Sequence, residues 1–98
     1  MPLKTLPCDP AEDLVDPRDQ VELLAEAFAS GERKFIAAAL GAVSRARGMA
    51  SVAEKAGITR PALYKALSET GDPQLSTLIG VVKALGLRLS VEPAGAGE

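Results

Sequence analysis

The chain has 98 residues, of which 47% are hydrophobic, enough for one domain with a modest core (residues 1–98). Histidine and tryptophan are absent and Cys8 is the single cysteine, which excludes an intrachain disulfide and argues against metal sites, cofactors and histidine-dependent catalysis. No apolar run approaches the roughly 20 residues of a membrane span, and the net charge is −2, so we expect a soluble, cytoplasmic, non-enzymatic protein without a membrane partner.

Charged residues are unevenly distributed along the chain. Residues 1–32 hold eight acidic and two basic side chains, whereas residues 33–65 hold seven basic side chains against Glu54. Residues 66–98 are again mildly acidic. Such segregation is typical of a chain with one surface for phosphate groups and a separate acidic surface, although charges that merely solvate helix faces are the alternative.

Residues 1–15 are predicted to be an extended segment. Prolines at positions 2, 7 and 10 prevent a helix, and residues 3–6 could form a short edge strand. The helical part of the domain is then expected over residues 16–86. Asp16 can cap its first helix, and Pro17 presets the backbone angle of the first helical residue. Gly31 ends this helix near residue 30, and its predicted buried stripe is Val21, Leu24, Ala25 and Phe28.

A second helix is predicted over residues 32–47 and ends at Gly48. Gly41 lies inside it, which suggests close packing of a neighbouring helix. Arg45 and Arg47 in the last turn complement the helix dipole, and contact with phosphate is the weaker alternative for them. The expected buried stripe is Phe35, Ile36, Ala39, Leu40 and Val43.

The stretch 49–68, MASVAEKAGITRPALYKALS, is predicted to be two short helices joined at Gly57. Ala53 is small enough for a close helix crossing, Ile58 can plug the turn and Thr59 can cap the second helix. This spacing is typical of a helix-turn-helix, whose second helix enters the major groove of DNA. An ordinary αα-hairpin in a helical bundle is the alternative. The apolar positions that specify the pattern are Val52, Ala53, Ala56, Leu63, Ala66 and Leu67.

If the second hairpin helix lies in a DNA groove, Arg60 is the best base reader, because a guanidinium can bond guanine bidentately. Lys65 and Tyr64 suit phosphate oxygens, although Tyr64 could equally seal the edge of the core. Ser51 is the polar contact expected from the first hairpin helix. The candidate DNA-binding residues are Ser51, Thr59, Arg60, Pro61, Tyr64, Lys65 and Ser68.

After the hairpin, Asp72 and Pro73 are predicted to start a fifth helix by the same device as Asp16 and Pro17. Gly86 stops it, and alternation of apolar and polar residues then predicts a strand over 87–92, followed by a tail over 93–98. An isolated strand is unstable, so we expect it to pair with residues 3–6 or with a second subunit in a homodimer. The predicted core face of the fifth helix is Leu75, Leu78, Ile79, Val82 and Leu85.

The stretches IAAALGAVSRARGM and AGITRPALYKALSETGDPQLSTLIGVVKALGLRLSVEP resemble the addiction-module antidote family. These are small HigA-like antitoxins with a lambda-repressor-like helix-turn-helix of the Xre/Cro type. The resemblance covers most of the chain and implies a bacterial protein that neutralises a RelE/HigB-type toxin and represses its own operon. It also implies DNA-facing roles for Thr59, Arg60, Tyr64 and Lys65. The chain departs from the family at Ala50-Ser51, where a polar Thr-Gln-like pair is common at the start of the first hairpin helix.

We therefore predict a mostly α, five-helix lambda-repressor-like domain with a short C-terminal strand. The predicted function is that of a dimeric antitoxin, whose partners are a palindromic double-stranded DNA operator and the toxin. Two alternatives are a stand-alone transcriptional regulator of the same type and a protein-interaction module that has lost DNA binding. Ala50 and the net negative charge favour the last of these.

Overall fold

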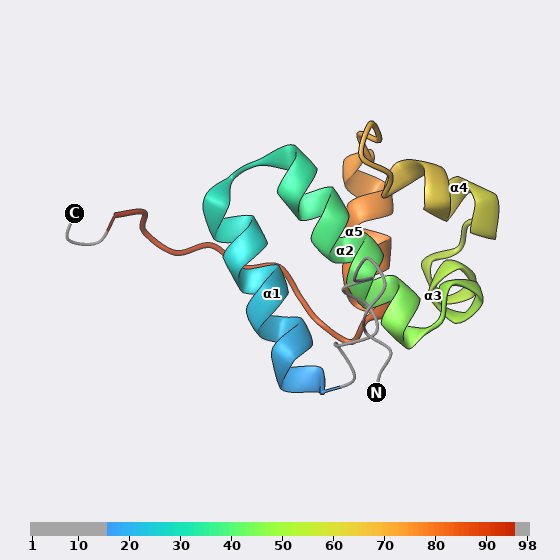
Figure 1. The fold of residues 1–98 in the computed structure, drawn as a ribbon, viewed down its shortest axis with the longest axis horizontal. Coiled ribbons are helices and arrows are strands. Elements are labelled where there is room, and N and C mark those ends of the chain that lie inside the picture. Colours follow the sequence, from blue (N-terminus) through green and yellow to red (C-terminus); the bar gives the residue numbers. More distant parts are fainter. Residues whose placement is uncertain (1–15, 96–98) are drawn as a thin grey trace, which may run out of the picture.

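The computed structural model describes residues 16–95, and this part of the chain forms five α-helices. In Figure 1, α1 and α2 pack side by side, α5 lies behind α2, and α3 and α4 form the end of the molecule farthest from α1. A mostly helical fold with five helices is therefore confirmed, while the extended segment predicted over 1–15 lies outside the described residues. The helices are α1 (Pro17–Ser30), α2 (Arg33–Arg47), α3 (Met49–Ala56), α4 (Arg60–Ala66) and α5 (Leu75–Ala84).

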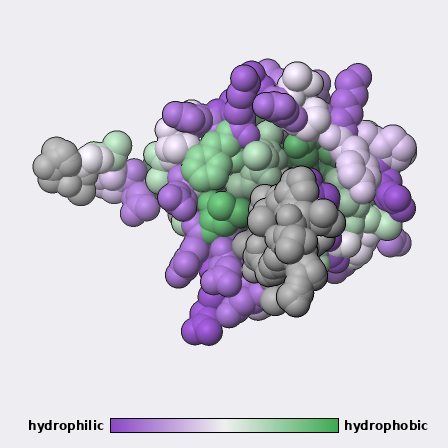
Figure 2. Space-filling view, viewed as in Figure 1, coloured by the Kyte–Doolittle hydropathy of each residue, from purple (hydrophilic) through white to green (hydrophobic). Residues whose placement is uncertain are grey.

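The hydrophobic core receives buried side chains from all five helices. Leu40 of α2, Leu63 of α4 and Val81 of α5 have no exposed surface. Leu24 of α1 and Val52 of α3 retain 5% and 2% exposure and complete the same cluster. Burying one such aliphatic side chain contributes about 1.5–3 kcal/mol, so this cluster is what holds the short helices together. Polar side chains surround an apolar area over α1 and α2 in Figure 2.

Helix ends follow the local signals in the sequence. The Asp16 carboxylate accepts a hydrogen bond from the backbone N–H of Arg18 at 2.9 Å and caps α1. Gly31 ends α1 in the left-handed conformation at φ 70°, which glycine adopts without steric cost. Gly48 separates α2 from α3 with only one residue between them, again at a positive φ of 105°. The start of α1 and the two glycine stops were thus predicted correctly.

The start of α5 was predicted wrongly. Residues 71–74 are irregular, and α5 begins at Leu75 with Gln74 in the N-cap position. Gly71 packs against the end of α4, and the chain must move away from that contact before it can form a helix. The helix therefore starts after the Asp72-Pro73 pair and not at it.

The strand predicted over 87–92 is not borne out. Residues 87–93 follow α5 without helix or strand, and no strand forms anywhere within residues 16–95. Leu87 packs against the core, but Leu89 is 42% exposed and Val91 is 97% exposed. The alternating pattern gives an irregular segment because residues 16–95 supply no partner strand for it. The other predicted partner, residues 3–6, lies outside the described range. In Figure 1 this segment runs past α1 and away from the helices.

The buried faces of α1 and α2 differ in part from those predicted. On α1, Val21 and Ala25 are exposed, while Gln20 and Ala27 are buried with Leu24. The stripe of α2 is confirmed at Ala39, Leu40 and Val43, whereas Phe35 and Ile36 at its beginning are only half-buried. The rotation of α1 follows from Gln20, whose amide oxygen accepts a hydrogen bond from Nε of Arg47 at 2.8 Å. This bond joins α1 to the end of α2 and draws a polar side chain inward.

The buried face of α5 is also displaced from the prediction. Leu75 is 68% exposed and Ile79 is 40% exposed, whereas Val81 takes the fully buried position. Val82 and Leu85 are buried as predicted, and Leu78 is half-buried. Because α5 begins beyond the end of the core, its first turn is left largely uncovered.

Two glycines allow close contacts between elements. A Cβ atom built at Gly80 of α5 would lie 3.2 Å from the carbonyl oxygen of Ala56 in α3. One built at Gly41 of α2 would lie 3.4 Å from the carbonyl oxygen of Leu67, just after α4. Gly41 thus packs against the residue that follows α4, at the edge of ordinary contact distance. None of the five described helices is long and apolar enough to cross a membrane.

Candidate nucleic-acid interface

α3 and α4 form a hairpin around a three-residue turn, residues 57–59. Gly57 adopts φ 78°, and its N–H donates to the carbonyl oxygen of Glu54 at 3.1 Å. The N–H of Ile58 donates to the carbonyl oxygen of Ala53 at 3.0 Å. This pair of bonds is the Schellman arrangement, which satisfies the last carbonyls of a helix and requires a residue that tolerates a positive φ. The turn therefore forms where the sequence predicts it.

The second hairpin helix is capped as predicted. The Thr59 hydroxyl oxygen accepts a hydrogen bond from the N–H of Ala62 at 3.1 Å. Pro61 has no N–H to offer. Among the first three residues of α4, the N–H of Ala62 is bonded to the cap and Pro61 has none. Arg60 is the one whose N–H remains. The start of α4 therefore leaves few backbone N–H groups for an external acceptor such as phosphate, and a contact there would depend mainly on side chains.

One face of the hairpin is buried and the other is exposed. Val52, Ala53 and Leu63 face the core with at most 3% exposure. Ile58 is half-buried and packs against them, as expected for a residue that plugs the turn. The hairpin is therefore fixed to the rest of the molecule by its apolar side.

The opposite face carries most of the residues predicted to contact DNA. The turn and α4 expose Thr59, Arg60, Pro61, Tyr64 and Lys65, with Tyr64 46% exposed. They include two cations, a phenol and no acidic side chain. At 46% exposure Tyr64 is also compatible with the alternative in which it seals the edge of the core.

The two remaining candidates lie at the ends of the hairpin. Ser51 is exposed in the first turn of α3. Ser68 is half-buried just beyond α4, and its hydroxyl donates a hydrogen bond to the carbonyl oxygen of Lys65 at 2.9 Å. Ser68 therefore closes α4, and its hydroxyl proton is already engaged.

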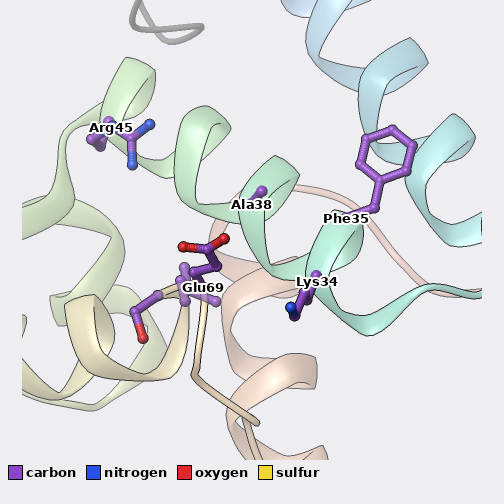
Figure 3. A pocket seen from close by; sticks show the side chains of 7 residues that line it. Lys34, Phe35, Ala38, Arg45 and Glu69 are labelled. Carbon is purple, nitrogen blue, oxygen red and sulfur yellow. The ribbon is translucent and has the colours of Figure 1, made fainter.

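An open hollow of about 560 Å³ lies between α2 and the chain that follows α4. Figure 3 shows Glu69 between Arg45 and Lys34 on its wall, with Phe35 turned toward α1. Its wide opening and mixed charges do not form an enclosed binding site for a small molecule. Within residues 16–95, no group of three potential ligands is placed to hold a metal ion.

A second hollow of about 310 Å³ lies where α1 ends and α2 and α5 begin. Phe28, Ile36 and Leu78 make its apolar floor, and Arg33 and Asp72 line it with charge. The Arg33 guanidinium reaches across to the loop 68–74 and donates to the carbonyl oxygen of Gly71 at 2.7 Å. The side chain joins the start of α2 to the loop after α4.

The sequence did not reveal this contact or the role of Gly71. Residues 69–73 have the composition of a turn, and turn composition does not show which carbonyl a distant arginine will find. The partly buried Gln20–Arg47 bond was missed for the same reason, since 27 residues separate its partners. That bond also assigns Arg47 a structural role, the interpretation that its place in the last turn of α2 favoured.

Comparison with known proteins gives two matches of wide coverage. A family model described as "Probable addiction module antidote protein" matches residues 4–93. An uncharacterized protein of Haemophilus influenzae is 42% identical over 84 residues, which cover 86% of this chain and 87% of that protein. No solved structure matches the chain.

Proposed function

The chain belongs to the family of probable addiction module antidote proteins, and from this premise we propose that it is the DNA-binding antitoxin of a type II toxin–antitoxin module. In this proposal it neutralises a RelE/HigB-type toxin and represses its own operon. The α3–α4 hairpin acts as a helix-turn-helix of the lambda-repressor (Xre/Cro) type, with α4 in the major groove. A toxin partner follows from the family; the toxin class, the DNA and the repression are the proposed steps.

The observation that carries the DNA-binding role is the exposed face of α4. Arg60 and Lys65 are both exposed on α4, while Leu63, which packs in the core, has no exposed surface. A helix that is fixed by apolar side chains and holds no acidic residue can approach a polyanion without electrostatic penalty from its own residues. In this proposal Arg60, at the first position of α4, reads a base, and Lys65, in its last turn, contacts phosphate.

We propose that the protein binds its operator as a homodimer. Leu89 and Val91 lie exposed on the segment after α5, and a second copy would cover them. A two-fold dimer places two α4 helices on half-sites about one DNA turn, roughly 34 Å, apart. The operator is then palindromic and lies in the promoter of the chain's own operon.

The test is a titration of the DNA upstream of the gene, repeated over a range of salt concentrations. Arg60→Ala should cost about 1–3 kcal/mol and relax the preference at one base position. Lys65→Ala should weaken binding to all sequences alike and reduce the salt slope by about 0.9 for each phosphate that the side chain neutralises. If both variants bind the operator and unrelated DNA as wild type does, α4 is not the recognition helix.

We further propose that the toxin contacts the acidic first third of the chain. α1 carries Asp19, Glu22 and Glu26 on exposed positions, and a toxin that cleaves or binds RNA presents a basic surface. α1 and α4 lie at opposite ends of the molecule in Figure 1, so toxin and DNA can be bound together.

To test this docking surface, Glu22 and Glu26 are changed together to Lys, and residues 1–15 are deleted in a separate variant. Toxin affinity should fall by more than threefold in at least one of them while operator affinity is retained. Toxin affinity within threefold of wild type in both, about 0.6 kcal/mol, places the toxin elsewhere on the chain.

A further inference from the structure

We infer that Arg33 is a positioning residue for α4: by holding Gly71, it sets the angle at which α4 presents Arg60, Tyr64 and Lys65. The inference rests on the proposed DNA-binding function for its consequence, but the mechanical link itself does not depend on DNA. Arg33 lies at the first residue of α2, on a different helix from the residues it would place.

The first link is the hydrogen bond between Arg33 and Gly71. A guanidinium N–H donates to the carbonyl oxygen of Gly71 at 2.7 Å, across 38 residues of sequence. The distance is short for an N–H···O bond, and bonds from a charged donor are stronger than neutral ones. The site is partly buried, which reduces competition from water.

The second link is the contact between Gly71 and the end of α4. A Cβ atom built at Gly71 would lie 2.5 Å from the carbonyl oxygen of Lys65 and closer still to that of Ala66. The backbone of Gly71 therefore lies directly against the last carbonyls of α4, with no side chain between them. A shift of Gly71 is transmitted to α4 because no soft side chain can absorb it.

Hydrogen bonds between residues close in sequence link the same region. The N–H of Gly71 donates to the carbonyl oxygen of Ser68 at 2.9 Å, and the Ser68 hydroxyl donates to that of Lys65 at 2.9 Å. Residues 65–71 thus form one compact unit, and Arg33 ties that unit to α2. α2 is the longest of the five described helices, at 15 residues, and forms a firm support.

α4 needs such support because it is short. Its seven residues make only about two turns, and a helix of that length does not hold its own direction in water. Thr59 fixes the first turn, and Leu63 fixes the middle. At the end of the helix Leu67 is buried in the core with 5% exposure, and Arg33, through Gly71, adds a polar restraint on the last turn, where Lys65 lies. Bidentate reading of a base demands a placement of the helix within fractions of an ångström.

The experiment compares Arg33→Gln and Arg33→Lys with Lys34→Gln as the matched control. Lys34→Gln removes the same charge from the neighbouring residue of α2. Tyr64 is the single tyrosine and the chain has no tryptophan, so intrinsic fluorescence reports on α4 alone. In the free protein, Arg33→Gln should lower the steady-state anisotropy of Tyr64 and raise its quenching by acrylamide. Arg33→Lys should restore part of both values, and Lys34→Gln should leave them as in wild type.

Operator binding supplies the second measurement. Arg33→Gln should lose about tenfold in affinity with the salt slope of wild type, an effect within the usual range for coupling between sites. A slope reduced by about 0.9 would instead make Arg33 a direct phosphate contact and overturn the inference. Tyr64 fluorescence equal to that of wild type in Arg33→Gln would overturn it as well. Thermal melts show whether each variant is folded at the assay temperature. If Arg33→Gln is unfolded, the same measurements on Arg33→Lys test the inference.

The two proposals can fail separately. If wild-type protein binds no operator while Arg33→Gln still loosens Tyr64, the DNA-binding function is refuted and the link from Arg33 to α4 stands. If wild type binds DNA through Arg60 and Lys65 while Arg33→Gln changes neither Tyr64 nor affinity, the function stands and Arg33 is not a positioning residue.

Discussion

Replacing Gly71 with alanine should be among the most damaging single-methyl changes available in this chain. Gly71 is buried, and the added Cβ would lie 2.5 Å from the carbonyl oxygen of Lys65 and closer still to that of Ala66. A carbon and a carbonyl oxygen normally stay at least about 3.3 Å apart. The backbone must therefore open by a large part of an ångström, and it must do so at the end of a helix whose carbonyls cannot rotate away.

The expected loss follows from overpacking energetics. Inserting a methyl group into a well-packed site costs about 1–3 kcal/mol, and a clash with backbone belongs at the upper end. At about 4–8 °C per kcal/mol for a domain of this size, a loss of about 2 kcal/mol lowers the Tm by roughly 8–16 °C. Thermal and urea unfolding followed by circular dichroism measure this directly.

Gly41→Ala is the matched control, since it adds the same methyl group at a second contact with the end of the α4 region. There the new Cβ would lie 3.4 Å from the carbonyl oxygen of Leu67, an ordinary contact. Alanine also gains about 1 kcal/mol of helix propensity inside α2. Gly41→Ala should match wild type or exceed it in stability. Equal stabilities for Gly71→Ala and Gly41→Ala would refute the argument that backbone contact at residue 71 fixes α4.

Three further changes test other parts of the structure. Ser44→Ala should leave the free energy of unfolding in urea unchanged or raise it by about 1 kcal/mol, because the Ser44 hydroxyl is fully buried and has no hydrogen-bond partner among the described residues. A loss above about 1 kcal/mol would mean that the hydroxyl has a hydrogen-bond partner in solution. Thr59→Ala should lower the free energy of unfolding by about 1 kcal/mol, while Thr59→Ser should retain most of the cap. Equal stability of the two variants would show that the cap contributes nothing. Leu89→Arg should dissociate the proposed homodimer in analytical ultracentrifugation without lowering helicity, since Leu89 is 42% exposed in the single chain; a wild-type monomer at tens of micromolar would refute the dimer.

The parts of the fold that could be predicted are those set by neighbours in the sequence. Asp16 caps α1 through a bond to a residue two positions away, and Thr59 caps α4 through one three positions away. Gly57 turns the chain because its own backbone adopts a conformation that other residues avoid. The exposure of Tyr64 and Lys65 followed from the same short-range reasoning, since burying Leu63 at helical spacing turns the next two residues away from the core.

The parts that could not be predicted depend on contacts far apart in the sequence. Asp72-Pro73 is the same dipeptide as Asp16-Pro17, yet it does not start a helix. The preceding residue, Gly71, packs against the end of α4 and accepts a hydrogen bond from Arg33. The buried face of α1 includes Gln20, although the hydropathy of glutamine predicts an exposed position. Gln20 lies inward because its side chain accepts a hydrogen bond from Arg47. Neither partner can be read from the pattern of its own helix. The segment after α5 has strand-like alternation, but a strand exists only where another lies beside it.

The opposite ends of the molecule carry opposite charge, and this gives the free protein a molecular dipole moment. α1 holds Asp19, Glu22 and Glu26 against Arg18, while α4 holds Arg60 and Lys65 with no acid. In Figure 1 the two helices are separated by the width of the helical part. In the field of a polyanion such a molecule experiences a torque as well as an attraction, and it rotates with its α4 end forward before any contact is made. If the protein binds DNA as proposed, collisions are then productive more often than random tumbling allows, even though the net charge of −2 is unfavourable. Salt should therefore slow association much more than it speeds dissociation.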